Sequence, residues 1–170
     1  SVPLVEYLFS PHGGFQTSTF FCSKEVLLRV PFQKGLKGLQ DIDWMVRIAA
    51  DRNIKIVVLP DVLSIYYAPL RRNSVTQKLS WRDRFDWGRS HRNLLSRKEY
   101  ALFLQQFCLK RAKADKASIK EYCEILQETV KYGSVDVPFF ARSAAVLLFS
   151  EPLRQGLRHR IKSLLGSEAQ

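Results

Sequence analysis

The chain has 170 residues, of which 46% are hydrophobic, and its 27 lysine and arginine residues against 16 acidic ones give a net charge of +11. This length suits one compact domain or a small domain with an appendage. No apolar run is long enough to cross a bilayer, and three cysteines without a CxxC pair exclude a zinc-finger or disulfide-framework protein. The positive charge predicts an anionic partner, such as a phosphorylated ligand, a nucleic acid or an acidic membrane.

The first half of the chain alternates between patterns typical of strands and of helices. Runs rich in β-branched and aromatic residues predict strands at Phe15–Cys22, Ile54–Leu59 and Val62–Tyr67. A short helix is expected from the capping residue Ser23 to about Arg29, and an amphipathic helix over Asp41–Ala50. This alternation predicts an α/β layer.

From Ser80 onward the apolar residues repeat at helical spacing. We therefore expect a mostly α-helical region over residues 80–170, preceded by a domain boundary near the end of residues 1–79. Residues 139–149 are apolar nearly all round, which predicts that this segment is buried. A basic amphipathic helix is expected over Pro152–Leu165. The excess positive charge is larger in residues 80–170 (+7) than in residues 1–79 (+4).

Two aspartates at the start of the predicted helix Asp41–Ala50 form the strongest candidate site. Asp41 and Asp43 follow a loop with two glycines, and an aspartate at such a junction caps the helix through its side-chain oxygen. The helix dipole also favours an ionised carboxylate there. Residues two apart do not share a helix face, so one carboxylate would brace the helix while the other accepts a proton. The alternative is that both only cap a surface helix.

Several segments in order resemble the second half of a family 2 glycosyltransferase with the GT-A fold. These segments are Gly-Gly-Phe-Gln-Thr-Ser-Thr at residues 13–19, Val30-Pro31-Phe32, Gln40-Asp41-Ile42-Asp43-Trp44-Met45-Val46-Arg47, Ile54–Leu59 and Pro60-Asp61-Val62-Leu63-Ser64-Ile65-Tyr66. The third looks like the family's Glu-Asp-x-Asp-hydrophobic-x-x-Arg element. The resemblance covers residues 13–76, and residues 80–170 are not explained by it.

The resemblance implies an enzyme that moves a sugar from a nucleotide-sugar donor to an acceptor hydroxyl with inversion, in the synthesis of a surface glycan or polysaccharide. The family's general base maps onto Asp41, and Asp43 becomes a structural or acceptor-orienting group that Arg47 supports. The other substrate contacts expected are Gln16, Thr17 and Trp44 towards the acceptor, and Arg71 and Arg72 towards the donor phosphates. A solvated surface position for Arg47 and a solvated linker at Arg71 and Arg72 are the alternatives.

The chain also departs from the family pattern. Gln40 stands where the family has Glu, and Tyr67 stands where many relatives have His. The nucleotide-binding half, with its Asp-x-Asp motif, is absent. A divalent cation (Mg²⁺ or Mn²⁺) is therefore expected only for the full-length enzyme, with ligands outside this fragment, and no metal ligand is assigned here. The fragment is expected to be inactive alone.

The basic charge leaves a second class open, a nucleic-acid-binding or membrane-surface-binding module without catalysis. No glycine-aromatic RNA-binding pattern, zinc finger or helix-turn-helix signature accompanies the charge, so nucleic acid is the less favoured partner. The expected partners are a nucleotide-sugar donor and a glycan or lipid-linked acceptor. The expected location is the cytoplasm, with peripheral contact at the inner face of the membrane through the C-terminal helices as an option.

Overall fold

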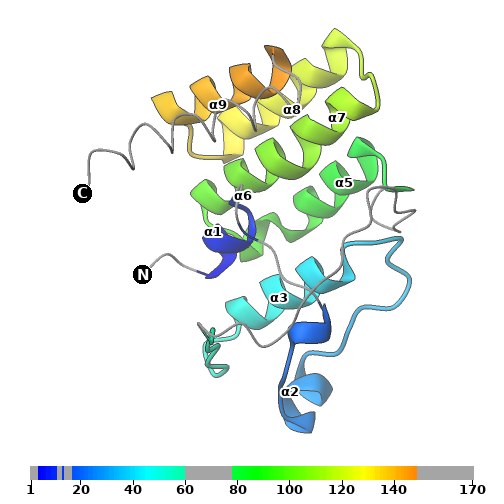
Figure 1. Ribbon diagram of the computed structural model, residues 1–170, viewed down its shortest axis with the longest axis vertical. Helices are drawn as coiled ribbons and strands as arrows, with labels where there is room; N and C mark the ends of the chain where they lie inside the picture. The colour runs from blue at the N-terminus through cyan, green and yellow to red at the C-terminus, as the bar shows by residue number, and fades with distance from the viewer. Residues whose placement is uncertain (1–3, 11–12, 14–16, 60–77, 149–170) are drawn as a thin grey trace, which may run out of the picture.

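The computed structural model describes residues 4–10, 13, 17–59 and 78–148, which form a stack of helices (Figure 1). Helices account for 69% of the described residues, and no strand occurs among them. The predicted α/β layer is therefore wrong for this part of the chain. Within the described residues, the segments expected to be helical do form helices, whereas those expected to be strands have no partner strand.

The helices run in chain order as follows: α1 (Leu4–Leu8), the 3₁₀ turn η1 (Thr17–Thr19), α2 (Lys24–Arg29), α3 (Gln40–Ala50), α5 (Trp81–His91), the 3₁₀ turn η2 (Arg92–Leu94), α6 (Arg97–Phe103), the π-helical stretch η3 (Leu104–Leu109), α7 (Lys110–Ala114), α8 (Ile119–Tyr132) and α9 (Val137–Leu148). Helices α6, η3 and α7 follow one another without a break and form one rod (Figure 1).

Two of the three predicted strands fall on described residues, and both are wrong. Within Phe15–Cys22 the described residues contain only the turn η1, and Ile54–Leu59 has no regular secondary structure. A β-branched apolar run is stable as a strand only when a neighbouring strand and a packed face support it. Ile54 and Ile56 pack against the core instead, while Val57 and Val58 stay exposed. The third predicted strand, Val62–Tyr67, lies outside the described residues.

The helix predictions are confirmed at α2 and α3. Ser23 occupies the N-cap of α2, although its side chain makes no capping hydrogen bond, and α3 begins one residue before the expected start at Asp41. In the second half, α5, α6 and α8 each begin with a capping box, in which a serine and an acidic residue three positions later bond each other's backbone N–H. The pairs are Ser80 with Asp83, Ser96 with Glu99, and Ser118 with Glu121.

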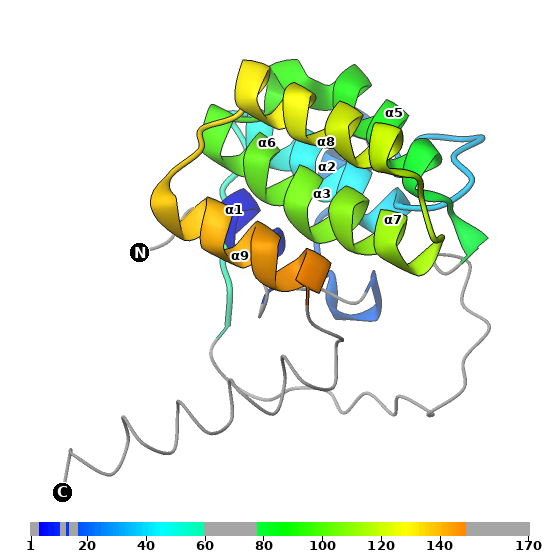
Figure 2. The ribbon, with the colours of Figure 1, turned by 90° about the horizontal axis from the view of Figure 1, so that it is seen from above.

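Helix α9 lies at the edge of the stack, so the prediction that residues 139–149 are buried against their neighbours holds for one face of the described part and fails for the other. Phe139 and Val146 are buried against η3 and α7, whereas Phe140 and Leu148 are 53% and 76% exposed. Figure 2 shows α9 covering only one side of the rod. The predicted basic helix Pro152–Leu165 lies outside the described residues.

The N-terminal helices pack onto the C-terminal ones. Helix α1 contacts both α3 and α6, and α3 contacts the turn η2 (Figures 1 and 2). Residues from both sides of the expected boundary after residue 79 therefore belong to one hydrophobic core, including Phe9, Val46, Phe85, Tyr100 and Phe103. None of the helices in the described ranges has the length and apolarity needed to cross a membrane.

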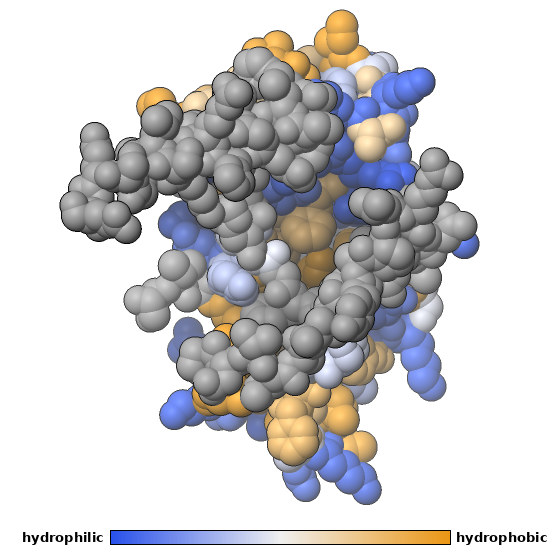
Figure 3. All heavy atoms as spheres, viewed as in Figure 1, coloured by the Kyte–Doolittle hydropathy of each residue, from blue (hydrophilic) through white to orange (hydrophobic). Residues whose placement is uncertain are grey.

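Apolar atoms reach the surface at the end of the molecule that carries α2 (Figure 3). Phe21 is fully exposed and Leu28 is 71% exposed, with Leu27 and Phe32 exposed to a lesser degree. The basic residues Lys24 and Lys34 lie in the same stretch of chain.

Candidate functional site

The loop before α3 approaches a neighbouring side chain closely. A Cβ placed on Gly38 would lie 2.5 Å from Cδ1 of Leu79, so a larger residue there would have to displace the Leu79 side chain. Leu39 follows with a φ of 63° and occupies the N-cap without a side-chain hydrogen bond. Asp41 is consequently the second residue of the helix, and the expectation that an aspartate caps α3 is wrong.

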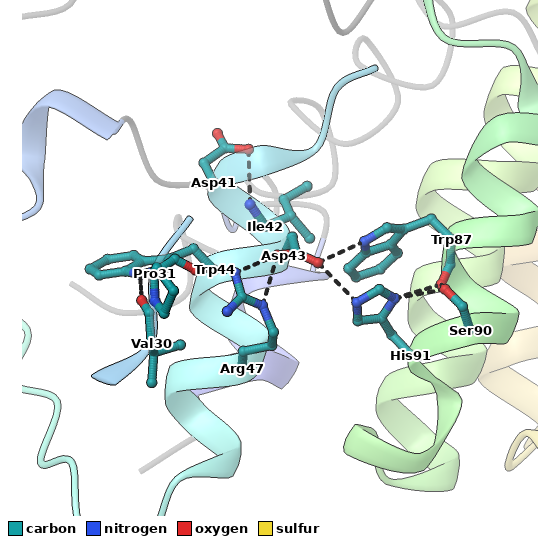
Figure 4. A network of polar contacts seen from close by, with 10 residues as sticks. All are labelled: Val30, Pro31, Asp41, Ile42, Asp43, Trp44, Arg47, Trp87, Ser90 and His91. Atoms are coloured by element: carbon teal, nitrogen blue, oxygen red, sulfur yellow. Dashed lines mark hydrogen bonds and ion pairs between the residues drawn. The ribbon is translucent and has the colours of Figure 1, made fainter. Parts of the chain in front are cut away.

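Asp41 points away from the rest of the polar cluster at the start of α3, as Figure 4 shows. Its side chain is half-buried, and its Oδ1 accepts a hydrogen bond of 2.9 Å from the backbone N–H of Ile42. Position two of the helix places the carboxylate at the N-terminal end of α3. A partly accessible carboxylate is suited to accept a proton or a hydrogen bond from a ligand.

Asp41 contributes to the wall of a pocket of about 150 Å³ between α1, α3 and η3. The other described residues of the wall are Leu8, Gly13, Phe20, Ile42, Met45 and Phe107. Asp41 is therefore the one ionisable side chain among the described residues that line this pocket.

Asp43 lies on the opposite side of the same helical turn and is completely buried. Its Oδ2 accepts hydrogen bonds from Arg47, at 2.8 Å from Nε and 2.7 Å from Nη2. Its Oδ1 lies 3.2 Å from Nε1 of Trp87 and 2.9 Å from Nε2 of His91, both on α5. The pairing of Arg47 with Asp43 is the one that their four-residue spacing predicts. Arg47 also donates to the backbone oxygen of Pro31, at 2.9 Å.

His91 contacts Asp43 through one ring nitrogen and its own helix through the other. Its Nε2 donates to the Asp43 carboxylate, and its Nδ1 lies 3.0 Å from the carbonyl oxygen of Trp87 and 2.9 Å from the hydroxyl oxygen of Ser90. Nδ1 donates to the Trp87 carbonyl in the imidazolium form and accepts from Ser90 in the neutral form. The hydrogen bond to Asp43 accordingly raises the pKa of His91, against the opposing effect of burial.

The carboxylate of Asp43 is ionised in this cluster. Burial alone would raise the pKa of Asp43, but the hydrogen bonds from His91, Arg47 and Trp87 outweigh burial and lower the pKa below its usual value. One carboxylate is thus held between the Arg47 guanidinium and the His91 imidazole at the interface of α3 and α5. This arrangement fixes the first turn of α3, and with it the position of Asp41.

Trp44 is packed into the core. Its indole Nε1 donates to the carbonyl oxygen of Val30 at 2.6 Å, and its ring stacks on Phe20 and Phe32 at centroid distances of 5.4 Å and 4.8 Å. Only 3% of the residue is exposed. The aromatic sandwich holds the loop around Phe32 against α3, and a substrate would reach Trp44 only if this sandwich opened.

Among the remaining expected contacts, Thr17 is the one that lies on described residues. Thr17 is exposed in the turn η1. Gln16, Arg71 and Arg72 lie outside the described residues. Of the sites expected from the sequence, the structure therefore brings together Asp43 and Arg47, and it places Asp41 beside the pocket.

Sequence reasoning missed the two α5 residues that complete the cluster, Trp87 and His91. They follow Asp43 by more than forty positions, and no local spacing connects them with it. The one available signal was their own four-residue spacing, which puts an indole and an imidazole on the same face of α5. The two rings stack at a centroid distance of 4.5 Å.

The donor atoms of the described residues do not gather into a metal site. Across the described ranges, no three His, Cys, Asp or Glu side chains lie close enough together to hold a metal ion. The carboxylate of Asp43 is saturated by Arg47, Trp87 and His91. These residues do not fit a divalent cation.

No protein-family model matches the chain, and neither a curated protein nor a solved structure matches it.

Proposed function

We propose that this chain is the acceptor-side part of an inverting, nucleotide-sugar-dependent glycosyltransferase. The observation that carries the proposal is the separation of roles within one helical turn. Asp43 is buried between Arg47 and His91, whereas Asp41 is half-buried and borders a pocket. An acceptor-activating site needs one such accessible base on a rigid support. The proposal concerns the activity and does not include an α/β layer in this chain.

Asp41 acts as the general base in the proposed reaction. Its carboxylate takes the proton of the acceptor hydroxyl while the hydroxyl oxygen forms a bond to the anomeric carbon of the donor. The bond between that carbon and the nucleoside diphosphate breaks, so the configuration is inverted. The described residues do not fit a divalent cation, so the proposed step is written with Asp41 as the only acting group of the described residues.

The proposal requires a nucleotide-binding half that this chain does not supply, and we place it upstream in a longer polypeptide. That half would bind the donor, together with the Mg²⁺ or Mn²⁺ that the family resemblance implies. The acceptor would be a glycan or a lipid-linked molecule, and the product a surface glycan. We place the enzyme in the cytoplasm, peripheral to the inner face of the membrane.

The test uses the natural reading frame with any sequence upstream of Ser1. Hydrolysis and transfer are measured with a panel of nucleotide sugars for the wild type and for Asp41→Asn. Asparagine keeps the size and the acceptor for the N–H of Ile42 but removes the base. We expect turnover to fall about 10²- to 10⁴-fold, the usual contribution of a general base, with donor affinity unchanged.

Asp86→Asn serves as the matched control, because Asp86 is exposed on α5 and lies outside the polar cluster. It removes a negative charge without touching the pocket, so it should turn over like the wild type. Full activity of Asp41→Asn would show that another residue is the general base. Absence of donor turnover by the wild type across the whole panel would reject the transferase and favour the binding-module alternative.

A further inference from the structure

The pocket beside Asp41 has the size and lining of a site for an apolar group. Its volume is about 150 Å³, and its wall includes Leu8, Phe20, Ile42, Met45 and Phe107. An apolar cavity of about 150 Å³ lined by such residues accommodates a benzene ring. The pocket is therefore large enough for one aromatic ring or a short branched hydrocarbon.

The same wall is poorly suited to a sugar ring. A bound sugar presents several hydroxyl groups, and each one loses water on entering the pocket and needs a new partner. Among the described residues of the wall, Asp41 is the one side chain with strong hydrogen-bonding atoms. Its Oδ1 already accepts from the N–H of Ile42, which leaves Oδ2 towards a ligand. The side chains of the described part of the wall can thus satisfy about one donor group, at one end of an otherwise apolar body.

The far wall is held in place by the π-helical stretch η3. Phe107 on this stretch stacks on Phe103 and meets Phe9 edge-on, with centroid distances of 5.2 Å and 5.7 Å. Gln105 of the same stretch is buried and donates to Phe139 O and Ser143 Oγ on α9, at 3.0 Å and 2.8 Å. π-helical turns are frequent at functional sites. The rings of this wall are therefore fixed before any ligand arrives, which lowers the entropic cost of binding.

We propose that this pocket binds the apolar body of a hydroxyl-bearing ligand, an aromatic ring or a short branched hydrocarbon, with its hydroxyl donating to Asp41. The identification of this ligand as the sugar acceptor rests on the proposed function, and it narrows the acceptor to an alcohol or phenol on an apolar body. The binding itself does not depend on catalysis, so the two statements can be tested apart.

The test uses the one methionine of the chain as a probe, because Met45 lies in the pocket wall. Protein labelled with ¹³C at the methionine methyl group gives one methyl signal from the pocket once any initiator methionine is removed. Benzyl alcohol, toluene and D-glucose are titrated in turn into the full 170-residue chain. We expect benzyl alcohol and toluene to shift the Met45 signal saturably and D-glucose to leave it in place.

Asp41→Leu then tests the polar end of the pocket, with Asp86→Leu as the control at an exposed position. Without the carboxylate acceptor, the affinity for benzyl alcohol should fall about threefold to tenfold relative to the affinity for toluene, which is the range of one hydrogen bond. Comparing the ratio of the two dissociation constants in wild type and variant cancels the different hydrophobicity of the ligands. Phe107→Trp, which fills the pocket, should abolish the shifts by both aromatic ligands, and circular dichroism verifies that it folds.

The outcomes separate this inference from the proposed function. Saturable binding of benzyl alcohol without any turnover of nucleotide sugars supports the proposed ligand site and contradicts the transferase proposal. Sugar transfer without a Met45 shift by either aromatic ligand contradicts the proposed ligand site and supports the transferase proposal. An equal shift by D-glucose, or an unchanged ligand ratio in Asp41→Leu, also overturns the inference.

Discussion

Nε2 of His91 lies 2.9 Å from Oδ1 of Asp43, across the interface between α5 and α3 (Figure 4). The two residues belong to the two regions into which the sequence pattern divides the chain. Because Asp43 also binds Arg47 on its own helix, the contact joins an N-terminal helix to the C-terminal stack through a single buried carboxylate.

The cluster makes stability depend on pH in the neutral range. The pKa of His91 is raised in the folded protein above its ordinary 6.5. The contact that raises the pKa of His91 stabilises the folded protein fully below about pH 6.5. This stabilisation is lost as the pH rises through the pKa of His91 in the folded protein. We expect the free energy of unfolding, measured with urea, to decline as the pH rises from about 6 to about 9, more steeply than in His91→Gln. Glutamine still donates to Asp43 but does not titrate, so parallel profiles of the two proteins would contradict the raised pKa of His91.

The two aspartates of α3 should respond very differently to the same substitution. Asp43→Asn leaves the charges of Arg47 and His91 facing each other without a buried anion, and removing one partner of a buried pair costs about 3–5 kcal/mol. Asp41→Asn keeps the N–H acceptor at a half-buried site and should change stability by no more than about 0.5 kcal/mol. Chemical unfolding of both variants checks the contrast. Similar losses would mean that Asp43 is not held as the distances indicate.

Gly88 lies where α5 passes closest to the ring of Phe103. An added Cβ would lie 2.5 Å from Cε1 of that buried ring, which Phe9 and Trp87 hold from other sides. Overpacking costs about 1–3 kcal/mol, against a gain of about 1 kcal/mol from the better helix propensity of alanine. Gly88→Ala should therefore lower the thermal midpoint.

Two comparisons sharpen the Gly88 test. Asp86→Ala on the exposed face of α5 should leave the midpoint nearly unchanged. Gly88→Ala combined with Phe103→Leu should lose less stability than the sum of the single variants, because leucine makes room for the new methyl group. Strict additivity would show that the two positions do not touch.

The cysteines should differ sharply in reactivity. Burial raises the pKa of the Cys108 thiol, and this residue is fully buried, whereas Cys123 is exposed on α8. Ellman's reagent should modify Cys123 first, since the thiolate is the reactive form. Cys108 should react only at the rate of unfolding. In Cys123→Ser the fast phase should disappear, and mass spectrometry identifies the modified residue in each phase. Rapid labelling of Cys108 in the native protein would contradict its placement.

The helices were predictable from the sequence because their signals are local. Ser80, Ser96 and Ser118 each precede an acidic residue by three positions, and apolar residues repeat at helical spacing after them. The strand predictions failed because a strand is not a local structure. The apolar residues of Ile54–Leu59 required a partner that the described part of the chain does not provide, and Ile54 and Ile56 pack onto helices instead.

The candidate site was predictable in part for the same reason. The four-residue spacing of Asp43 and Arg47 on one helix predicts their ion pair. Which of the two aspartates is buried was not accessible, because that depends on Trp87 and His91 from a distant helix. The pocket beside Asp41 was equally hidden, since Leu8, Phe20 and Phe107 come from three separate parts of the chain.

The three capping boxes have a consequence for the order of folding. Helices α5, α6 and α8 carry their start signals in adjacent residues, so they can begin to form before distant parts of the chain meet. Helix α3 begins after a residue with positive φ and without a side-chain cap, and one oxygen of its buried carboxylate is satisfied from α5. The C-terminal helices should therefore form the folding nucleus, on which α3 assembles late. In a kinetic φ-value analysis of folding, mutations in α5 should give high values and mutations in α3 low ones.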